Sequence, residues 1–243
     1  MKKYIALVLA LVLAFAVVGC ETSEKTPSPT PDVKSEGVMT YAEYDAAEEG
    51  SQVVIETYVQ GKQSWWDNKA TVYTQDHDGA YFCYEMACTE EDYAKLVPGT
   101  KIKVTGEKGS WAGEIEVMNA TFEILEGSYV AEPTDVTSLV GSDDLVKSQN
   151  QKVSFKGMTV EAYNGEEGKG FAYKNDQPGD DLYFQASVNG TTVEFCVEYY
   201  LTNDETDVYK TVETLQPGQT IDVEGFLYWY EGANPHVTGI TVK

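Results

Sequence analysis

The sequence predicts a mostly β protein with two copies of one small barrel domain in tandem. The phrase from Leu96 to Gly106 recurs from Leu215 to Gly225, 119 residues later, with Leu, Pro, Gly, Ile, Val and Gly at the same spacing. Short β-branched and aromatic runs, separated by Gly, Pro, Asn and Asp, fill most of the remaining chain. Since solenoid and propeller units recur every 20–50 residues or so, a period this long indicates that a whole domain is duplicated.

The first copy is expected over residues 38–126, and it begins with a short helix. Thr40-Tyr41-Ala42-Glu43 has the spacing of a capping box, and Gly50 ends the helical stretch. A second short helix, begun by Thr89, separates the third strand from the fourth. The five expected strands span 52–60, 70–74, 80–86, 102–107 and 114–125, with a turn at 76–79 and a loop at 109–113.

The second copy is expected over residues 134–243 and follows the same order. A helical stretch over 136–150 leads into it, Asn189-Gly190 is a hairpin signal, and a helix over 204–215 precedes the repeated phrase. The expected strands span 152–162, 171–173 together with 182–188, 191–199, 220–226 and 236–242.

Three strands, a helix and two further strands form the order of the five-stranded Greek-key OB barrel. The predicted fold class is therefore mostly β, with two tandem OB-fold-like Greek-key barrels and a short helix between strands three and four of each. Another small barrel or a β-sandwich built from the same strands is the alternative.

The repeated phrase has the form hydrophobic-x-Pro-Gly-x-x-Ile-x-Val-x-Gly, and it stands on the fourth strand of each copy. Together with the Thr40-Tyr41-Ala42-Glu43 lead-in, it resembles the OB-fold domains of bacterial extracellular proteins, over nearly all of the folded part. This resemblance implies binding of single-stranded nucleic acid or of an oligosaccharide.

The N-terminus has the pattern of a secretory signal. Lys2 and Lys3 precede an apolar run over 5–18, which is shorter than the roughly 20 residues that span a bilayer. Cys20, after Val17-Val18-Gly19, resembles the lipidated cysteine of bacterial lipoproteins, although an ordinary secreted protein could carry a cysteine there by chance. We expect a signal peptide over 1–19, a disordered tether over 20–37, and an extracytoplasmic protein anchored to the cell membrane by lipid on Cys20.

The chain is strongly acidic, with 17 Lys and Arg against 40 Asp and Glu, a formal net charge of −23 and no Arg. Arginine supplies the fork that suits phosphate and guanine recognition, and nucleic-acid binding depends on neutralising phosphates. The composition therefore argues against nucleic acid as a partner.

Catalytic and metal-binding patterns are not evident in the sequence. Its two histidines, His77 and His236, fall in different copies, and no nucleophile elbow, Walker loop or zinc pattern occurs. Cys83, Cys88 and Cys196 are expected to be structural thiols, and no acidic turn has EF-hand spacing. We expect a protein that is not an enzyme and carries no metal or cofactor.

Aromatic residues gather in the loops that flank the ligand face of OB barrels, between strands one and two and between strands four and five. All four tryptophans of the chain fall in these loops. They can stack on bases or sugars, or they can pack against other parts of the protein. The predicted ligand-binding residues are Trp65, Trp66, Trp111, Tyr163, Tyr228, Trp229 and Tyr230. Tyrosines that could extend this platform are Tyr73, Tyr81, Tyr84, Tyr173, Tyr183 and Tyr199.

These features predict a lipid-anchored, non-catalytic binding protein that holds an oligosaccharide or a peptide on its aromatic loops. Two alternatives remain at this point. The chain could be a structural or assembly component of a cell-envelope complex, recognising protein through the same faces. It could also bind single-stranded nucleic acid, as OB-fold relatives do.

Overall fold

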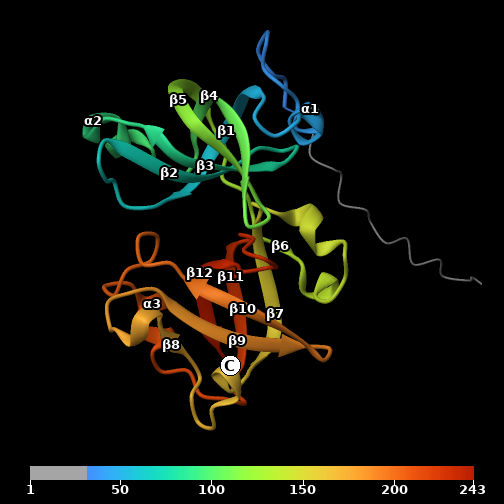
Figure 1. Cartoon of the computed structure of the whole chain (residues 1–243), viewed down its shortest axis with the longest axis vertical. Helices are drawn as coiled ribbons and strands as arrows, with labels where there is room; N and C mark the ends of the chain where they lie inside the picture. Colours follow the sequence, from blue (N-terminus) through green and yellow to red (C-terminus); the bar gives the residue numbers. More distant parts are fainter. Residues whose placement is uncertain (1–31) are drawn as a thin grey trace, which may run out of the picture. The chain divides into compact units, whose positions relative to one another are not determined.

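The computed structural model describes residues 32–243, in which two barrels follow one another along the chain (Figure 1). The first barrel contains α1 (Tyr41–Ala46), β1 (Gln52–Lys62), β2 (Lys69–Gln75), β3 (Ala80–Ala87), α2 (Glu90–Lys95), β4 (Thr100–Trp111) and β5 (Glu114–Ser128).

The second barrel has the same core elements with short additions. It contains β6 (Thr134–Asp135), η1 (Thr137–Leu139), η2 (Leu145–Ser148), β7 (Lys152–Val160), η3 (Tyr163–Gly165), β8 (Ala172–Tyr173), η4 (Lys174–Asp176), β9 (Leu182–Val188), β10 (Thr191–Val197), α3 (Asp207–Val212), β11 (Thr220–Phe226) and β12 (His236–Val242).

Both barrels close in the same strand order. The first runs β1-β2-β3-β5-β4, and β4 pairs again with β1. The second runs β7-β9-β10-β12-β11, and β11 pairs again with β7. In each barrel the third and fifth strands are parallel and the other neighbours are antiparallel. With α2 and α3 each standing between strands three and four, the predicted fold class is confirmed.

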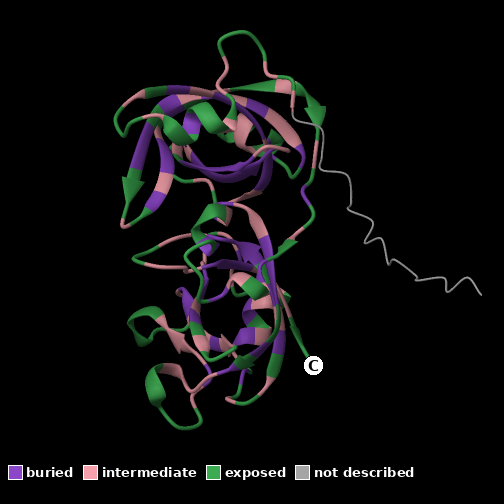
Figure 2. Ribbon diagram, turned by 90° about the vertical axis from the view of Figure 1, so that its right-hand side faces the viewer, coloured by how far each residue is buried: buried purple, intermediate pink, exposed green. Residues whose placement is uncertain are grey.

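Each barrel encloses its own hydrophobic core, drawn in purple on the inward sides of the strands (Figure 2). Along β1 the inward positions are Val53, Ile55 and Val59, all without solvent exposure. The branched side chains at these alternating positions favour the strand and fill the barrel, so one pattern specifies both the local structure and the packing.

The first half of the repeated phrase forms the corner between the helix and the fourth strand. Leu96 and Leu215 are fully buried under α2 and α3. Gly99 and Gly218 then turn the chain with φ of 94° and 89°, a left-handed conformation that disfavours residues with a Cβ. Leu and Gly therefore recur in the phrase because both barrels have the same corner at this place.

The final glycine of the phrase allows the fourth and fifth strands to approach closely. A Cβ on Gly106 would lie 2.7 Å from the carbonyl oxygen of Met118, and one on Gly225 would lie 2.3 Å from that of His236. The strand register shifts beside both glycines. A β-bulge that admits only glycine thus stands at the same place in each barrel.

Two sequence expectations differ from the structure. The stretch 136–150 holds only the 3₁₀ turns η1 and η2, because Gly141 between them has φ of 85° and breaks the helical path. The expected loop at 109–113 is mostly strand, since β4 continues to Trp111 and pairs with Glu114 across a two-residue turn. Long β4 and β5 strands therefore extend as a hairpin.

The cysteines among the described residues are buried and free, in agreement with structural thiols. Cys83 of β3 and Cys196 of β10 hold equivalent positions, each beside the parallel fifth strand of its barrel.

The segment before α1 contacts the first barrel. Lys34 donates to Asp76 Oδ2 at 2.6 Å, and His77 Nδ1 lies 2.9 Å from Asp32 Oδ1. The expected signal peptide and Cys20 lie outside the described residues. Within residues 32–243, no helix has the length and apolar character needed to cross a membrane.

Candidate functional site

The second and third strands of each barrel turn one face outward, and OB-type barrels hold their ligands on that face. In the first barrel, Tyr73 of β2 and Phe82 of β3 lie on this side, outside the barrel core. In the second, Tyr183 of β9 pairs with Cys196 of β10, whose neighbours along the strand point into the core.

Part of the first face is covered by the second barrel. Tyr73 stacks on Phe226 with ring centroids 4.4 Å apart, and its hydroxyl hydrogen-bonds with His236 Nδ1 at 2.6 Å. Phe82 meets the ring of Tyr228, which stacks on His236 at 4.2 Å. These five residues, which we call the aromatic junction, join the two barrels. Burial lowers the pKa of His236 to about 3, so its imidazole is neutral at physiological pH.

A polar contact adjoins the aromatic junction. The backbone amide of Trp229 donates to Glu114 Oε2 at 2.8 Å, and Gln149 Nε2 donates to the carbonyl oxygen of Gly113 at 2.8 Å. Glu114 is without solvent exposure, and its Oε1 atom has no hydrogen-bond partner among the described residues. Burial raises the pKa of this carboxyl to about 8, so the uncharged form is favoured at neutral pH.

Beside the aromatic junction lies a hollow of about 610 Å³ on the strand-two and strand-three face of the second barrel, which we call the barrel-2 hollow. Tyr163 enters it from the loop between β7 and β9, and Tyr230 from the loop between β11 and β12. Both flanking loops of this OB-type face therefore contribute a ring. The lining residues are Gln63, Phe82, Tyr84, Tyr163, Lys174, Asp181, Tyr183, Glu194, Cys196, Glu198, Tyr228, Tyr230, Asn234 and His236.

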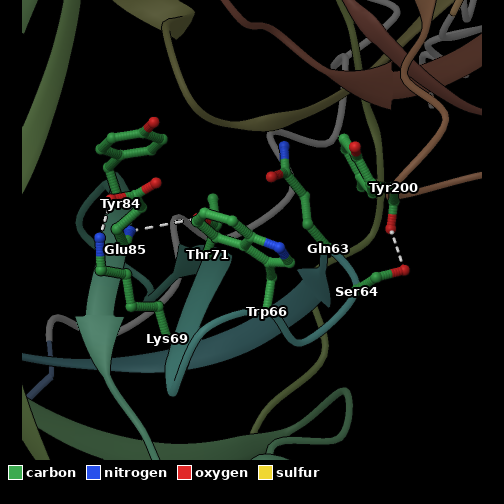
Figure 3. A pocket seen from close by; sticks show the side chains of 8 residues that line it. All are labelled: Gln63, Ser64, Trp66, Lys69, Thr71, Tyr84, Glu85 and Tyr200. Atoms are coloured by element: carbon green, nitrogen blue, oxygen red, sulfur yellow. Dashed lines mark hydrogen bonds and ion pairs between the residues drawn. The ribbon is translucent and has the colours of Figure 1, made fainter.

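A second hollow, of about 350 Å³, lies on the uncovered half of the first barrel's face, and we call it the barrel-1 hollow. Trp66 stands at its centre, with Tyr84 on one side and Tyr200 on the other (Figure 3). Its lining residues are Gln63, Ser64, Trp66, Lys69, Thr71, Tyr84, Glu85 and Tyr200. Gln63 and Tyr84 line both hollows, which are therefore neighbours; together we call them the aromatic cleft.

Four rings of the aromatic cleft are open to solvent. Trp66 is 66 % exposed, Tyr200 60 %, Tyr230 53 % and Tyr84 41 %. Large exposed apolar surfaces gathered in one depression are typical of an interaction site. The cleft therefore offers several flat rings on which planar groups can stack.

The aromatic cleft contains more carboxyl groups than lysines, and each lysine is paired with a carboxylate. Lys69 donates to Glu85 at 2.6 Å, and Lys174 donates to Asp181 at 2.8 Å. Among the described residues, Lys69 and Lys174 are the two lysines that line the aromatic cleft. Burial, followed by the charge of Asp181, raises the pKa of Glu198 to about 7.

The predicted tryptophans do not share one site. Trp66 lines the aromatic cleft, whereas Trp65 is half-buried and donates its indole N–H to the carbonyl oxygen of Cys88 at 3.0 Å. Trp229 packs against Gly113 beside the aromatic junction. Trp111 is exposed at the end of β4 and does not line the cleft.

The predicted tyrosines also divide between roles. Tyr163 and Tyr230 line the barrel-2 hollow, and Tyr228 lines it while packing in the junction. Among the additional tyrosines, Tyr84 and Tyr183 lie in the aromatic cleft. The others lie elsewhere: Tyr73 in the junction, Tyr81 in the first core, Tyr173 against Glu213 and Tyr199 against Asp204.

Sequence reasoning did not find Tyr200, Glu198 or Lys69. Tyr200 follows β10 and reaches the first barrel, where its carbonyl oxygen accepts from the backbone amide of Ser64 at 2.8 Å. A residue that completes a site on the other copy leaves no local signal. The only local hint in the sequence was a pair of adjacent tyrosines, Tyr199 and Tyr200, just after the third strand.

The histidines are occupied by structural contacts, His236 in the junction and His77 with Asp32. Over residues 32–243, no group of three or more His, Cys, Asp or Glu side chains is arranged to hold a metal ion.

No protein-family model matches the sequence, and no curated protein is significantly similar to it. Solved structures with a similar arrangement include the p204 HINb domain (TM-score 0.36, 11 % identity, 81 % of this chain and 100 % of that chain). Another is a replication protein A heterotrimer bound to single-stranded DNA (TM-score 0.34, 10 % identity, 82 % of this chain and 51 % of that chain). A third is a murine DNA-binding protein with double-stranded DNA (TM-score 0.36, 10 % identity, 78 % of this chain and 94 % of that chain).

These comparisons correct two sequence-based expectations. The prediction that the aromatic loops hold an oligosaccharide or a peptide, and the argument against nucleic acid as a partner, are wrong on this finding, since three of the similar structures are described with single- or double-stranded DNA. Base stacking on aromatic rings does not depend on net charge, so an acidic composition does not by itself exclude nucleic acid. At 9–11 % identity the likeness concerns the fold, so any ligand of this chain must be argued from its own residues.

Proposed function

We propose that the chain binds single-stranded nucleic acid in the aromatic cleft, with successive bases stacked on its exposed rings. One observation carries this proposal: the strand-two and strand-three faces of the two barrels carry neighbouring hollows, lined by Trp66, Tyr84, Tyr200, Tyr183 and Tyr230. Aromatic rings on this face are how OB-type barrels hold single strands, because every base offers a flat π surface.

The cleft favours a single strand over a duplex. Bases in a duplex are stacked on each other and cannot lie against protein rings without being flipped out. A single strand presents its bases freely, and a site of this fold spans roughly 4–16 nucleotides.

Stacking must supply most of the affinity, because the cleft has few cations. Lys69 and Lys174 already pair with carboxylates, and the chain contains no Arg. Each phosphate neutralised in a single strand adds about 0.7 to the slope of log affinity against log salt concentration. With at most two lysines available, we expect a slope smaller than about 1.5 in magnitude.

Titration of a fluorescent oligonucleotide against residues 21–243 tests the proposal. Trp66→Ala and Tyr230→Ala each remove one stacking surface, worth about 1–3 kcal/mol, and should weaken binding by roughly 5- to 150-fold. Trp111→Ala is the matched control, because Trp111 is similarly exposed and lies outside the aromatic cleft. An equal loss in all three variants, or no binding by the unmodified protein in low salt, would refute the proposal.

We also propose that the chain is exported and anchored at a bacterial membrane through lipid on Cys20. The basic start, the apolar run and the Val17-Val18-Gly19-Cys20 sequence support this location. Labelling of cells with a radioactive fatty acid should mark the protein but not Cys20→Ala. Equal labelling of both forms would contradict the anchor.

A further inference from the structure

Glu198 places an unpaired hydrogen-bonding atom at the aromatic cleft. It directly follows β10 and lines the barrel-2 hollow. Its Oε2 atom is buried and has no hydrogen-bond partner in the described part of the chain. The backbone amides of Leu201 and Thr202 donate to the main-chain carbonyl oxygen of Glu198, at 3.0 and 2.9 Å, and fix the turn that carries this side chain. A buried acceptor of this kind is costly unless a ligand supplies a donor.

The lysine and the side-chain amide that line the same hollow already donate to other groups. Lys174 is engaged with Asp181, and Asn234 Nδ2 donates to the backbone carbonyl oxygen of Glu194 at 3.3 Å. The side chain of Glu194 contributes a further carboxylate to the same hollow. The hollow therefore suits a planar ligand with a surplus of N–H groups.

We propose that the barrel-2 hollow is a guanine-selective pocket in which Glu198 accepts hydrogen bonds from the base. The inference rests on the proposed function and names the base that the cleft prefers. Guanine carries two adjacent donors, N1–H and N2–H, on its Watson–Crick edge, whereas adenine, cytosine and thymine each carry one donor group there. Splayed bases of single strands are read on this edge by protein side chains.

The test uses residues 21–243 and oligothymidylates of about eight nucleotides, a length within the site size of one OB barrel. Four strands differ only in one central residue: guanine, inosine, adenine or thymine. Inosine is the informative analogue because it lacks only the exocyclic amino group of guanine. We expect the guanine strand to bind at least about fivefold more tightly than the thymine strand, with inosine between them.

Glu198→Gln keeps the size of the side chain and replaces one acceptor oxygen with a donor. This variant should lose the guanine preference while still binding the thymine strand. Glu205→Gln is the matched control, because Glu205 is exposed and does not line the cleft. Thermal unfolding of both variants shows whether any change in binding comes from a loss of folding.

The outcomes separate this inference from the proposed function. Guanine preference in the unmodified protein and its loss only in Glu198→Gln would support the pocket. Binding of all four strands with equal affinity, or a preference that survives in Glu198→Gln, would overturn the pocket and leave single-strand binding intact. Binding of none of the strands would overturn both.

Discussion

Among single residues, Glu114 is a carboxyl held in a site that disfavours its charge. Its pKa is about 8 in the folded protein against an ordinary value of 4.5. Between these pH values the folded state keeps a proton that the unfolded state has released, so the free energy of unfolding falls as pH rises through this window, by up to about 1.4 kcal/mol per pH unit. Below pH 4.5 this penalty is absent. Glu114→Gln should therefore flatten the decline and raise stability at pH 8 by roughly 1–4 kcal/mol, measured by urea denaturation.

Glu123→Gln is the control for this substitution, since Glu123 lies exposed on the same strand. It should leave the pH profile unchanged. Some decline persists in Glu114→Gln, because burial also raises the pKa of Glu116 and Glu198. An unchanged slope in Glu114→Gln would show that this carboxyl is solvated or paired in solution.

Single residues also show how far the sequence predicts where the aromatic side chains lie. Trp66, Tyr163 and Tyr230 were placed in the correct loops, because loop positions follow from the strand order alone. Trp229 was placed in the correct loop too, yet its ring packs on Gly113 of the other barrel. Which loop aromatics are covered depends on how the second copy packs, and local sequence does not encode that.

At the scale of the elements, the bulge between β11 and β12 predicts which glycine substitutions the barrel tolerates. Gly225→Ala would place a Cβ 2.3 Å from the His236 carbonyl oxygen, a backbone atom that cannot move without breaking the strand pairing. We expect a loss of roughly 2–4 kcal/mol in the free energy of unfolding. Gly239→Ala, on β12, meets no atom closer than 3.5 Å and should cost less than about 1 kcal/mol. Chemical denaturation of both variants makes the comparison, and equal costs would refute the close approach.

The sequence predicted the helices and strands better than it predicted the positions of single side chains. Strands β11 and β12 begin and end where the pattern placed them, because branched residues alternate there between clear turn signals. The prediction of a helical stretch over 136–150 was wrong, because polar residues and Gly141 prevent a continuous helix there. Short capping signals were reliable, as the Thr40 and Glu43 capping box shows.

At the scale of the whole described chain, the aromatic junction makes the two barrels share buried surface. Tyr73 is 1 % exposed and contacts both Phe226 and His236. Barrels that share such a core should unfold together, since separating them exposes several rings and leaves His236 without its hydrogen-bond partner. The unmodified protein is therefore expected to show one calorimetric transition for residues 32–243.

Tyr73→Ala tests this coupling because it removes the ring common to both contacts. The substitution should cost roughly 3–5 kcal/mol and divide the calorimetric trace into two transitions, one for each barrel. Tyr73→Phe keeps the stacking and removes only the hydroxyl, so it should lower the melting temperature while preserving a single transition. If Tyr73→Ala still unfolds in one step, the barrels are coupled through the polar contact of Glu114 and Trp229 instead. Because the aromatic cleft takes residues from both barrels, uncoupling them should also weaken ligand binding without altering any ring that touches the ligand.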